Sequence, residues 1–130
     1  MNPRFYIQSS IFLFLFIQFY RQRYLKNQIY TWVGSNKSIL VSINPFQQLP
    51  LYSPEIIQEH AHPPPNKQLS PHVYDIAYSA YSELCYNHTN QSILISGESG
   101  AGKTEATKQC LGFIAEVRFL FIFHSIDCWF

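Results

Sequence analysis

The feature that most constrains this chain is a glycine-rich octapeptide at residues 97–104, Gly-Glu-Ser-Gly-Ala-Gly-Lys-Thr. Its spacing, G-x-x-x-x-G-K-[ST], is typical of a phosphate-binding loop that joins a strand to a helix. Residues 92–96 before it, Ser-Ile-Leu-Ile-Ser, form a short segment with β-branched residues, which predicts a buried parallel strand. The sequence from Glu105 onward has helical spacing. The fold must therefore place this loop between a strand and a helix.

The residue types in this loop suit the polyphosphate of a nucleotide. Gly97, Gly100 and Gly102 allow tight turns that point several N–H groups into one concavity, at the positive end of a helix dipole. Lys103 would reach the β- and γ-phosphates, and the Thr104 hydroxyl would be a ligand of Mg²⁺. A glycine-rich turn that only joins two elements is the alternative, and the Lys-Thr pair directly after the last glycine disfavours it.

Length and composition limit the other classes of function. A chain of 130 residues suffices for one ordinary domain but not for most complete nucleotide-driven machines. The formal net charge of +1 gives no basic field for binding nucleic acid. Cys85, Cys110 and Cys128 are odd in number and widely spaced, so we expect no disulfide framework and a reduced, intracellular setting.

The distribution of phenylalanine divides the chain into three parts. Of the 11 phenylalanines, all except Phe46 lie near the two ends. We therefore expect a folded domain at residues 27–117, between two aromatic segments at residues 1–26 and 118–130. The sequence leaves the status of both end segments open.

The first segment contains an apolar run at residues 11–17. A membrane span needs about 18 or more apolar residues, so we expect none here. A signal peptide is an alternative that the missing small-residue cleavage site disfavours; a secreted chain would offer glycosylation acceptors at residues 36–38, 87–89 and 90–92. A third interpretation is that residues 1–26 are not native coding sequence.

A hairpin and two helices are predicted ahead of the loop. Residues 29–33 and 38–43 have the pattern of strands joined by a Gly-Ser-Asn turn. Ser53, followed by proline, predicts the start of a short helix that ends near His60. A second helix is predicted to open at Ser70. Its apolar face would consist of Val73, Ile76, Ala77, Ala80, Tyr81 and Leu84.

Four further titratable residues are interpreted as solvent-exposed. His60 and His62 have no additional Cys, Asp or His at zinc-like spacing, which favours a solvated loop over a metal site. Asp75 and Glu83 lie eight residues apart on the expected helix, too far for a paired acid and base. No catalytic residue is assigned from these positions.

A helix is expected over residues 102–117 after the loop, because its apolar residues keep helical spacing. Residues 118–127 superficially resemble the hydrophobic strand whose terminal carboxylate holds Mg²⁺ in nucleotide hydrolases. The run abuts the preceding helix without a connection, and it is broken by His-Ser before Asp127. We therefore do not assign Asp127 to a metal site.

Together, these motifs resemble the myosin motor domain. The loop interior Glu-Ser-Gly-Ala-Gly and the glutamate that follows the loop, preceded by residues 90–96, are similar to the phosphate-binding loop of that family. Residues 39–52 resemble its adenine-side loop, and residues 70–74 resemble the segment that opens its next helix. The three blocks occur in the family's order and cover roughly residues 28–117.

The resemblance implies an α/β fold with a P-loop NTPase-type sheet and flanking helices, incomplete in this chain. It also implies a cytoplasmic, actin-based cytoskeletal motor that binds ATP and Mg²⁺. From the charge and the short apolar run we expect neither nucleic acid nor a membrane as a partner. Asn44, Pro45 and Tyr52 match positions beside the purine and ribose, whereas Gln47 stands where the family commonly has a basic residue. The binding residues expected from motif and resemblance are Gly97, Glu98, Ser99, Gly100, Ala101, Gly102, Lys103, Thr104, Glu105, Asn44, Pro45 and Tyr52, with Thr104 at the metal.

Two parts of the family's machinery do not occur in these 130 residues: a serine- and arginine-bearing switch, and a second switch of the Asp-Ile-x-Gly-Phe-Glu type. The family's strands beside the loop strand also come from far downstream, so residues 93–95 would have unpaired backbone groups. We therefore expect part of a motor domain that binds Mg-ATP and does not hydrolyse it efficiently alone. A small stand-alone P-loop enzyme and an inactive remnant are the alternatives.

Overall fold

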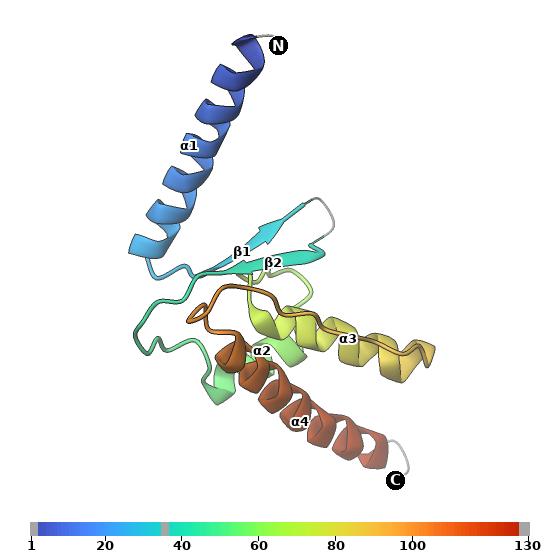
Figure 1. Cartoon of the computed structure of the whole chain (residues 1–130). Coiled ribbons are helices and arrows are strands. Elements are labelled where there is room, and N and C mark those ends of the chain that lie inside the picture. The colour runs from blue at the N-terminus through green and yellow to red at the C-terminus, as the bar shows by residue number, and fades with distance from the viewer. Residues whose placement is uncertain (1–2, 35–36, 128–130) are drawn as a thin grey trace.

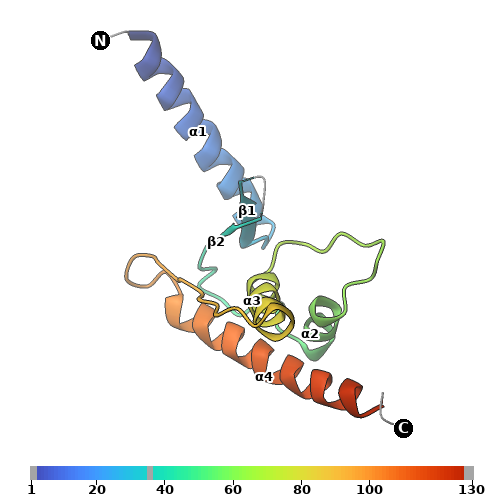
Figure 2. The same ribbon diagram turned by 90° about the vertical axis from the view of Figure 1, so that its right-hand side faces the viewer.

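The computed structural model describes residues 3–34 and 37–127, and the side chains of residues 11–34 and 37–118. The elements in these ranges are, in order, α1 (Pro3–Leu25), β1 (Tyr30–Val33), β2 (Ile39–Ser42), α2 (Pro54–Ala61), α3 (Val73–Asn87) and α4 (Lys103–Asp127). Helices α2, α3 and α4 gather on one side of the β1–β2 hairpin, and α1 projects away from the other side (Figures 1 and 2).

The hairpin predicted from the sequence is confirmed. β1 pairs with β2 in antiparallel register, with Tyr30 opposite Ser42 and Val33 opposite Ile39. Gly34 follows β1 with a φ of 84°, in the left-handed region that glycine adopts without strain. Within the described residues these two strands are the whole sheet, so the larger sheet implied by the family resemblance does not form here.

The core lies where α3 packs against α4, and α2 contacts both helices. Tyr74 of α3 stacks on Phe113 of α4, with ring centroids 4.6 Å apart and planes inclined by 19°. The two side chains are 1% and 0% exposed. The buried apolar residues are Ile29, Tyr30, Ala61, Val73, Tyr74, Ala77, Cys110, Phe113 and Val117. This core fixes α4, and with it the helix start that follows the glycine-rich loop.

Helix α2 begins as predicted, at Pro54 after the N-cap residue Ser53. Helix α3 begins later than the Ser70 prediction, because His72 is its N-cap. His72 Nδ1 accepts a hydrogen bond from Tyr74 N at 3.2 Å, and Asp75 Oδ2 accepts one from His72 N at 3.1 Å. Histidine is not among the residues usually preferred at this position, so an N-cap at His72 was not predicted.

Helix α4 is longer than predicted. It continues past Val117 to Asp127 without a break, so residues 118–127 are helical and do not form the strand that they superficially resemble. No glycine or proline occurs after Gly112 to end the helix. Asp127 lies at the end of α4, and its side chain is outside the described ones.

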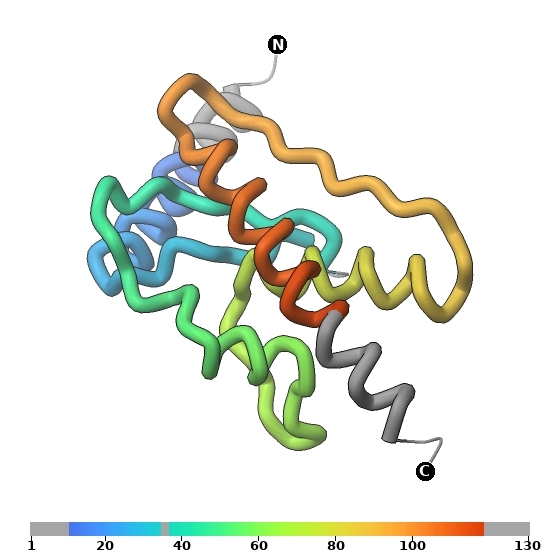
Figure 3. The backbone as a smooth tube through the Cα atoms, turned by 90° about the horizontal axis from the view of Figure 1, so that it is seen from below, coloured from blue at the N-terminus to red at the C-terminus, as the bar shows by residue number. Residues whose placement is uncertain are grey.

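The strand predicted at residues 92–96 is wrong. Residues 91–98 have no regular secondary structure, and Leu94 is 92% exposed rather than buried. This segment runs back from the end of α3 toward the start of α4 (Figure 3). In the described part of the chain no strand lies in hydrogen-bonding register with it, and an isolated strand cannot satisfy its own backbone groups.

The apolar run at residues 11–17 lies within α1, a helix of 23 residues that the sequence did not assign. Of the helices in the described ranges, none combines the length and the apolar character needed to cross a membrane.

Candidate nucleotide-binding site

The glycine-rich loop begins where the extended segment ends at Gly97 and leads into α4 at Lys103. Gly100 and Gly102 have φ values of 78° and 93°, which would strain any other residue. A Cβ at Gly97 would lie only 3.1 Å from the Ala101 Cβ, so this glycine permits a close approach. At all three glycine positions of the motif the backbone geometry thus favours glycine over other residues, as the sequence predicted.

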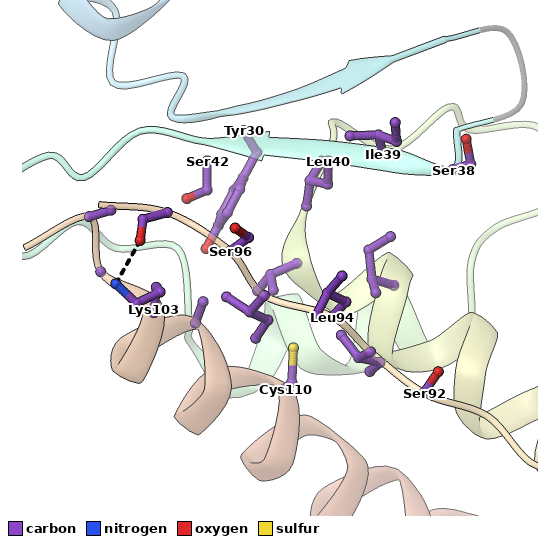
Figure 4. Close-up of a pocket in the computed structure, with 18 residues that line it drawn as sticks. Tyr30, Ser38, Ile39, Leu40, Ser42, Ser92, Leu94, Ser96, Lys103 and Cys110 are labelled. Carbon is purple, nitrogen blue, oxygen red and sulfur yellow. Dashed lines mark hydrogen bonds between the residues drawn. The ribbon is translucent and has the colours of Figure 1, made fainter. Parts of the chain in front are cut away.

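The Lys103 ammonium lies across the loop and ties its two ends together. Lys103 Nζ donates a hydrogen bond to Gly97 O at 2.8 Å (Figure 4). It donates a second one to Glu98 O, also at 2.8 Å. A backbone hydrogen bond from Ala101 N to Glu98 O at 3.1 Å closes the turn beneath it. An ammonium has three donors, so one N–H of Lys103 remains for a further acceptor in this position.

The first turn of α4 offers more hydrogen-bond donors. The first four amide groups of an α-helix have no acceptor within the helix, and they carry the positive end of its dipole. Here Ala106 N is satisfied by Gly102 O at 2.9 Å, while Lys103, Thr104 and Glu105 are exposed residues at the helix start. Donors, dipole and ammonium therefore concentrate positive potential at this end of α4.

Asn44 joins the hairpin side of the molecule to the loop. Its Nδ2 donates to Gly100 O at 2.8 Å, and its Oδ1 accepts from Phe46 N at 2.9 Å. A Cβ at Gly102 would lie 3.9 Å from the Asn44 Cβ, so the two residues are neighbours. The resemblance placed Asn44 at a nucleotide site, but no local sequence signal predicted its bond to a residue 56 positions away.

Pro45 and Tyr52 lie outside the glycine-rich loop, and each has a hydrogen bond to a tyrosine elsewhere in the fold. The Pro45 carbonyl accepts a hydrogen bond from the Tyr24 hydroxyl at 3.3 Å. The Tyr52 and Tyr30 hydroxyl oxygens are 2.7 Å apart. Burial raises the pKa of Tyr52, the hydrogen bond with Tyr30 lowers it, and the negative charge of Glu105 raises it further. The predicted places of Pro45 and Tyr52 beside a base stay predictions.

The acidic and hydroxyl residues of the loop are open to solvent. Glu98 and Ser99 are exposed. Glu105 accepts a hydrogen bond from Gln109 Nε2 at 2.8 Å. Across the residues that the structure describes, no group of three or more His, Cys, Asp or Glu side chains could hold a metal ion. A Mg²⁺ at Thr104 would thus need phosphate oxygens and waters as its other ligands, which is the coordination this ion favours beside a nucleotide.

A cleft of about 610 Å³ adjoins the loop, between β2, the extended segment and the first half of α4. Lys103 lies at one end of this cleft and Ser92 at the other, with Leu40, Leu94 and Cys110 along its length (Figure 4). The volume is that of ordinary ligand pockets. The loop therefore faces an open groove rather than a closed core.

The prediction of a solvated His60 is wrong, and Asp75 is solvated only in part. His60 is buried in α2, and its Nδ1 lies 2.7 Å from Asp75 Oδ1. Asp75 is only partly exposed, because it also caps α3 at His72. His62 and Glu83 are exposed, as predicted. The packing of α2 on α3 buries His60 and brings it to Asp75, and the spacing along the sequence contains no signal of that contact.

A family model described as the myosin head, or motor domain, matches residues 14–119. The chain belongs to the myosin head family. The resemblance carried by the loop, the adenine-side segment and the helix opening is thereby confirmed. The matched range contains all the candidate site residues and begins within α1.

The sequence is also similar to those of individual myosins. The chain is 54% identical over 97 residues to the high molecular weight form of myosin-1 from Acanthamoeba castellanii, covering 75% of this chain and 6% of that protein. It is 54% identical over 94 residues to the myosin-H heavy chain of Dictyostelium discoideum, covering 72% and 5%. It is 41% identical over 105 residues to unconventional myosin-Ib of Mus musculus, covering 78% and 9%. The chain thus spans 5% to 9% of the length of these relatives.

Proposed function

We propose that this chain holds the phosphate-binding part of a myosin-like motor and binds Mg-ATP with residues 97–104. The observation that carries the proposal is the folded loop itself. Two glycines with positive φ lead directly into an exposed helix start, and the Lys103 ammonium lies over the turn. Anions bind well at such a combination of free amide donors, helix dipole and cation.

Each residue has a separate task in this proposal. The amides at the start of α4 bind phosphate oxygens, and Lys103 exchanges one or both carbonyl acceptors for the β- and γ-phosphates. Thr104 supplies a hydroxyl to Mg²⁺, which neutralises phosphate charge when bound. Asn44 holds the loop through Gly100 O.

The base and ribose would lie on the side of Asn44, Pro45 and Tyr52. Tyr24 and Tyr30 hold the latter two through hydroxyl contacts, so this side is formed before a nucleotide arrives. Gln47 donates to Asn27 Oδ1 at 3.1 Å and provides no cationic contact. We therefore propose that most of the binding free energy comes from the phosphates.

We further propose that these residues bind ATP weakly and turn it over negligibly by themselves. Neither of the two switch motifs that would sense the γ-phosphate and orient water occurs in the 130 residues. Movement along actin filaments in the cytoskeleton is proposed for the motor to which such a segment belongs. It would depend on the much greater length seen in the relatives.

Titration with a fluorescent ATP analogue, with and without Mg²⁺, tests the phosphate site. Lys103→Ala should weaken binding at least tenfold, since a charge-assisted hydrogen bond contributes about 1.5–3 kcal/mol. Lys108→Ala is the matched control, because Lys108 lies on the same helix with a side chain that is 70% exposed. Equal affinities of the two variants would contradict the assignment of Lys103.

The metal site is tested by a second matched pair. Thr104→Ala should remove most of the Mg²⁺ enhancement of binding, whereas Thr107→Ala should keep it, because the Thr107 hydroxyl is bonded to Lys103 O within the helix. Phosphate release at an ordinary enzymatic rate would overturn the proposal of negligible turnover. It would favour a stand-alone P-loop enzyme instead.

A further inference from the structure

Helix α1 carries a large apolar surface outside the core. Its apolar side chains between residues 11 and 19 are 47% to 73% exposed, with Phe12 the most exposed. Soluble proteins rarely expose a contiguous apolar patch of this kind without a partner. The projection of α1 away from the other elements leaves the patch open along the helix (Figures 1 and 2).

The patch surrounds the helix. Residues 11–17 are seven consecutive apolar residues, and at about 100° per residue they cover every face of two turns. A helix that docks on a protein groove has an apolar stripe at i, i+3, i+4 and i+7, with polar residues behind it. A protein partner or a second copy of α1 would cover one face and leave phenylalanines exposed on the other. Lipid chains cover all faces at once.

The charge around the patch has one sign. The first acidic residue of the chain is Glu55, whereas Arg4, Arg21, Arg23, Lys26 and Lys37 precede it. Arg21 and Lys26 are exposed directly after the apolar run. Cationic residues beside an apolar helix attract anionic lipid headgroups, by about 1 kcal/mol for each basic residue near the surface.

The base of α1 is fixed to the rest of the fold. Arg23 Nε donates to Thr31 Oγ1 and Arg23 Nη2 donates to Tyr30 O, each at 2.8 Å. Asn27, with a φ of 58°, ends the helix, and its N–H donates to Tyr24 O at 2.9 Å. A partner that binds α1 would therefore also fix the position of the hairpin.

We propose that α1 binds anionic phospholipid membranes by burying residues 11–20 beneath the headgroups, with Arg21 and Lys26 at the lipid phosphates. Ten helical residues extend about 15 Å, half of the hydrocarbon thickness of about 30 Å, so residues 11–20 alone are too short to cross a bilayer. Dual apolar and cationic attachment is what stable surface binding requires.

Vesicle flotation of the whole chain tests the proposal. The chain should float with vesicles that contain phosphatidylserine, and far less with vesicles of phosphatidylcholine alone. The double variant Phe14→Asp, Phe16→Asp should bind at least tenfold more weakly, since burying one phenylalanine contributes about 1.5–3 kcal/mol. Leu111→Asp is the matched control, because Leu111 is 63% exposed on α4, and it should bind like the parent.

The electrostatic part has its own variants. Arg21→Gln with Lys26→Gln should weaken binding by about fivefold per charge removed, and Lys108→Gln should not. Raising the salt from about 0.1 M to about 1 M shortens the Debye length from about 10 Å to about 3 Å and should release part of the bound chain.

Three outcomes would overturn the proposal. They are no flotation with either vesicle, equal flotation of the Phe14, Phe16 and Leu111 variants, and a dimer in analytical ultracentrifugation that the Phe14, Phe16 variant abolishes while vesicles bind neither chain. Circular dichroism of each variant separates loss of binding from loss of folding. The exposed positions of these residues leave the core untouched.

Discussion

Helix α4 lies in two different environments, and the difference explains how the candidate site is held. Its middle is packed, since Cys110, Phe113 and Val117 are at most 4% exposed. Its first turn, and the extended segment that leads into it, are open, with Leu94 at 92% exposure. The phosphate-binding loop is therefore anchored mainly from the helix side. On the other side it has the Asn44 hydrogen bond and an unpaired segment.

The largest difference between the two environments should appear in stability. Phe113→Ala should lower the free energy of unfolding by about 3–5 kcal/mol, because it removes a fully buried ring and leaves a cavity beside Tyr74. Leu94→Ala should change it by less than about 0.5 kcal/mol. Urea unfolding followed by circular dichroism measures both. A large loss for Leu94→Ala would mean that the extended segment is packed after all.

The packed environment also contains a group that makes stability depend on pH. His72 is 5% exposed, and within the described residues its Nε2 has no hydrogen-bond partner. Burial, and after it the nearby His60, lowers the pKa of His72 from the ordinary 6.5 to about 4, although Asp75 and a backbone contact at Leu51 act in the opposite direction. Folded His72 is therefore neutral where unfolded His72 is protonated.

The sign of the effect follows from proton uptake by the unfolded chain. The free energy of unfolding should have its full value above about pH 6.5 and fall by up to about 3 kcal/mol as the pH drops to about 4. His72→Asn keeps an N-cap acceptor without a titrating ring and should flatten this dependence. His88→Asn, at an exposed C-cap position with a φ of 52°, should keep the parent's slope. The same slope in both variants would exclude His72 as the cause.

The smallest expected effect is the most local one. Asn44→Ala removes the side-chain bond to Gly100 O, which contributes about 1 kcal/mol. Amide hydrogen exchange at Gly100 and Gly102 should then become about fivefold faster, with little change in the core. Asn87→Ala, which removes an exposed bond to Glu83 on α3, should leave the loop unchanged. Unchanged exchange in the Asn44 variant would show that α4 alone holds the loop.

Local signals predicted the parts of this fold that depend on local contacts. The hairpin forms because β1 and β2 are close in sequence and pair with each other. The glycines of the loop have the backbone geometry that their motif requires. Residues 92–96 have the same β-branched character as β2, but a strand needs a partner, and the described chain provides none. The residue pattern of a segment alone does not show whether a pairing strand is present.

Contacts between distant segments explain the other differences. His60 is buried against Asp75 because α2 packs against α3, and His72 caps α3 because Asp75 completes the capping interaction. Asn44 reaches Gly100 because the hairpin lies over the start of α4. None of these contacts leaves a pattern in a single sequence. Residues 118–127 are helical because they continue a helix that nothing interrupts, although their aromatic composition also suits a strand.

The central claim is that residues 97–104 form the place where nucleotide phosphates bind. Two-dimensional amide NMR of the whole chain during titration with Mg-ATP tests it most directly. We predict that the largest shifts occur at the amides of Gly100, Gly102, Lys103 and Thr104, that Asn44 responds through Gly100, and that inorganic triphosphate reproduces the loop shifts. Shifts centred elsewhere, or none at saturating Mg-ATP with the core intact, would contradict the account.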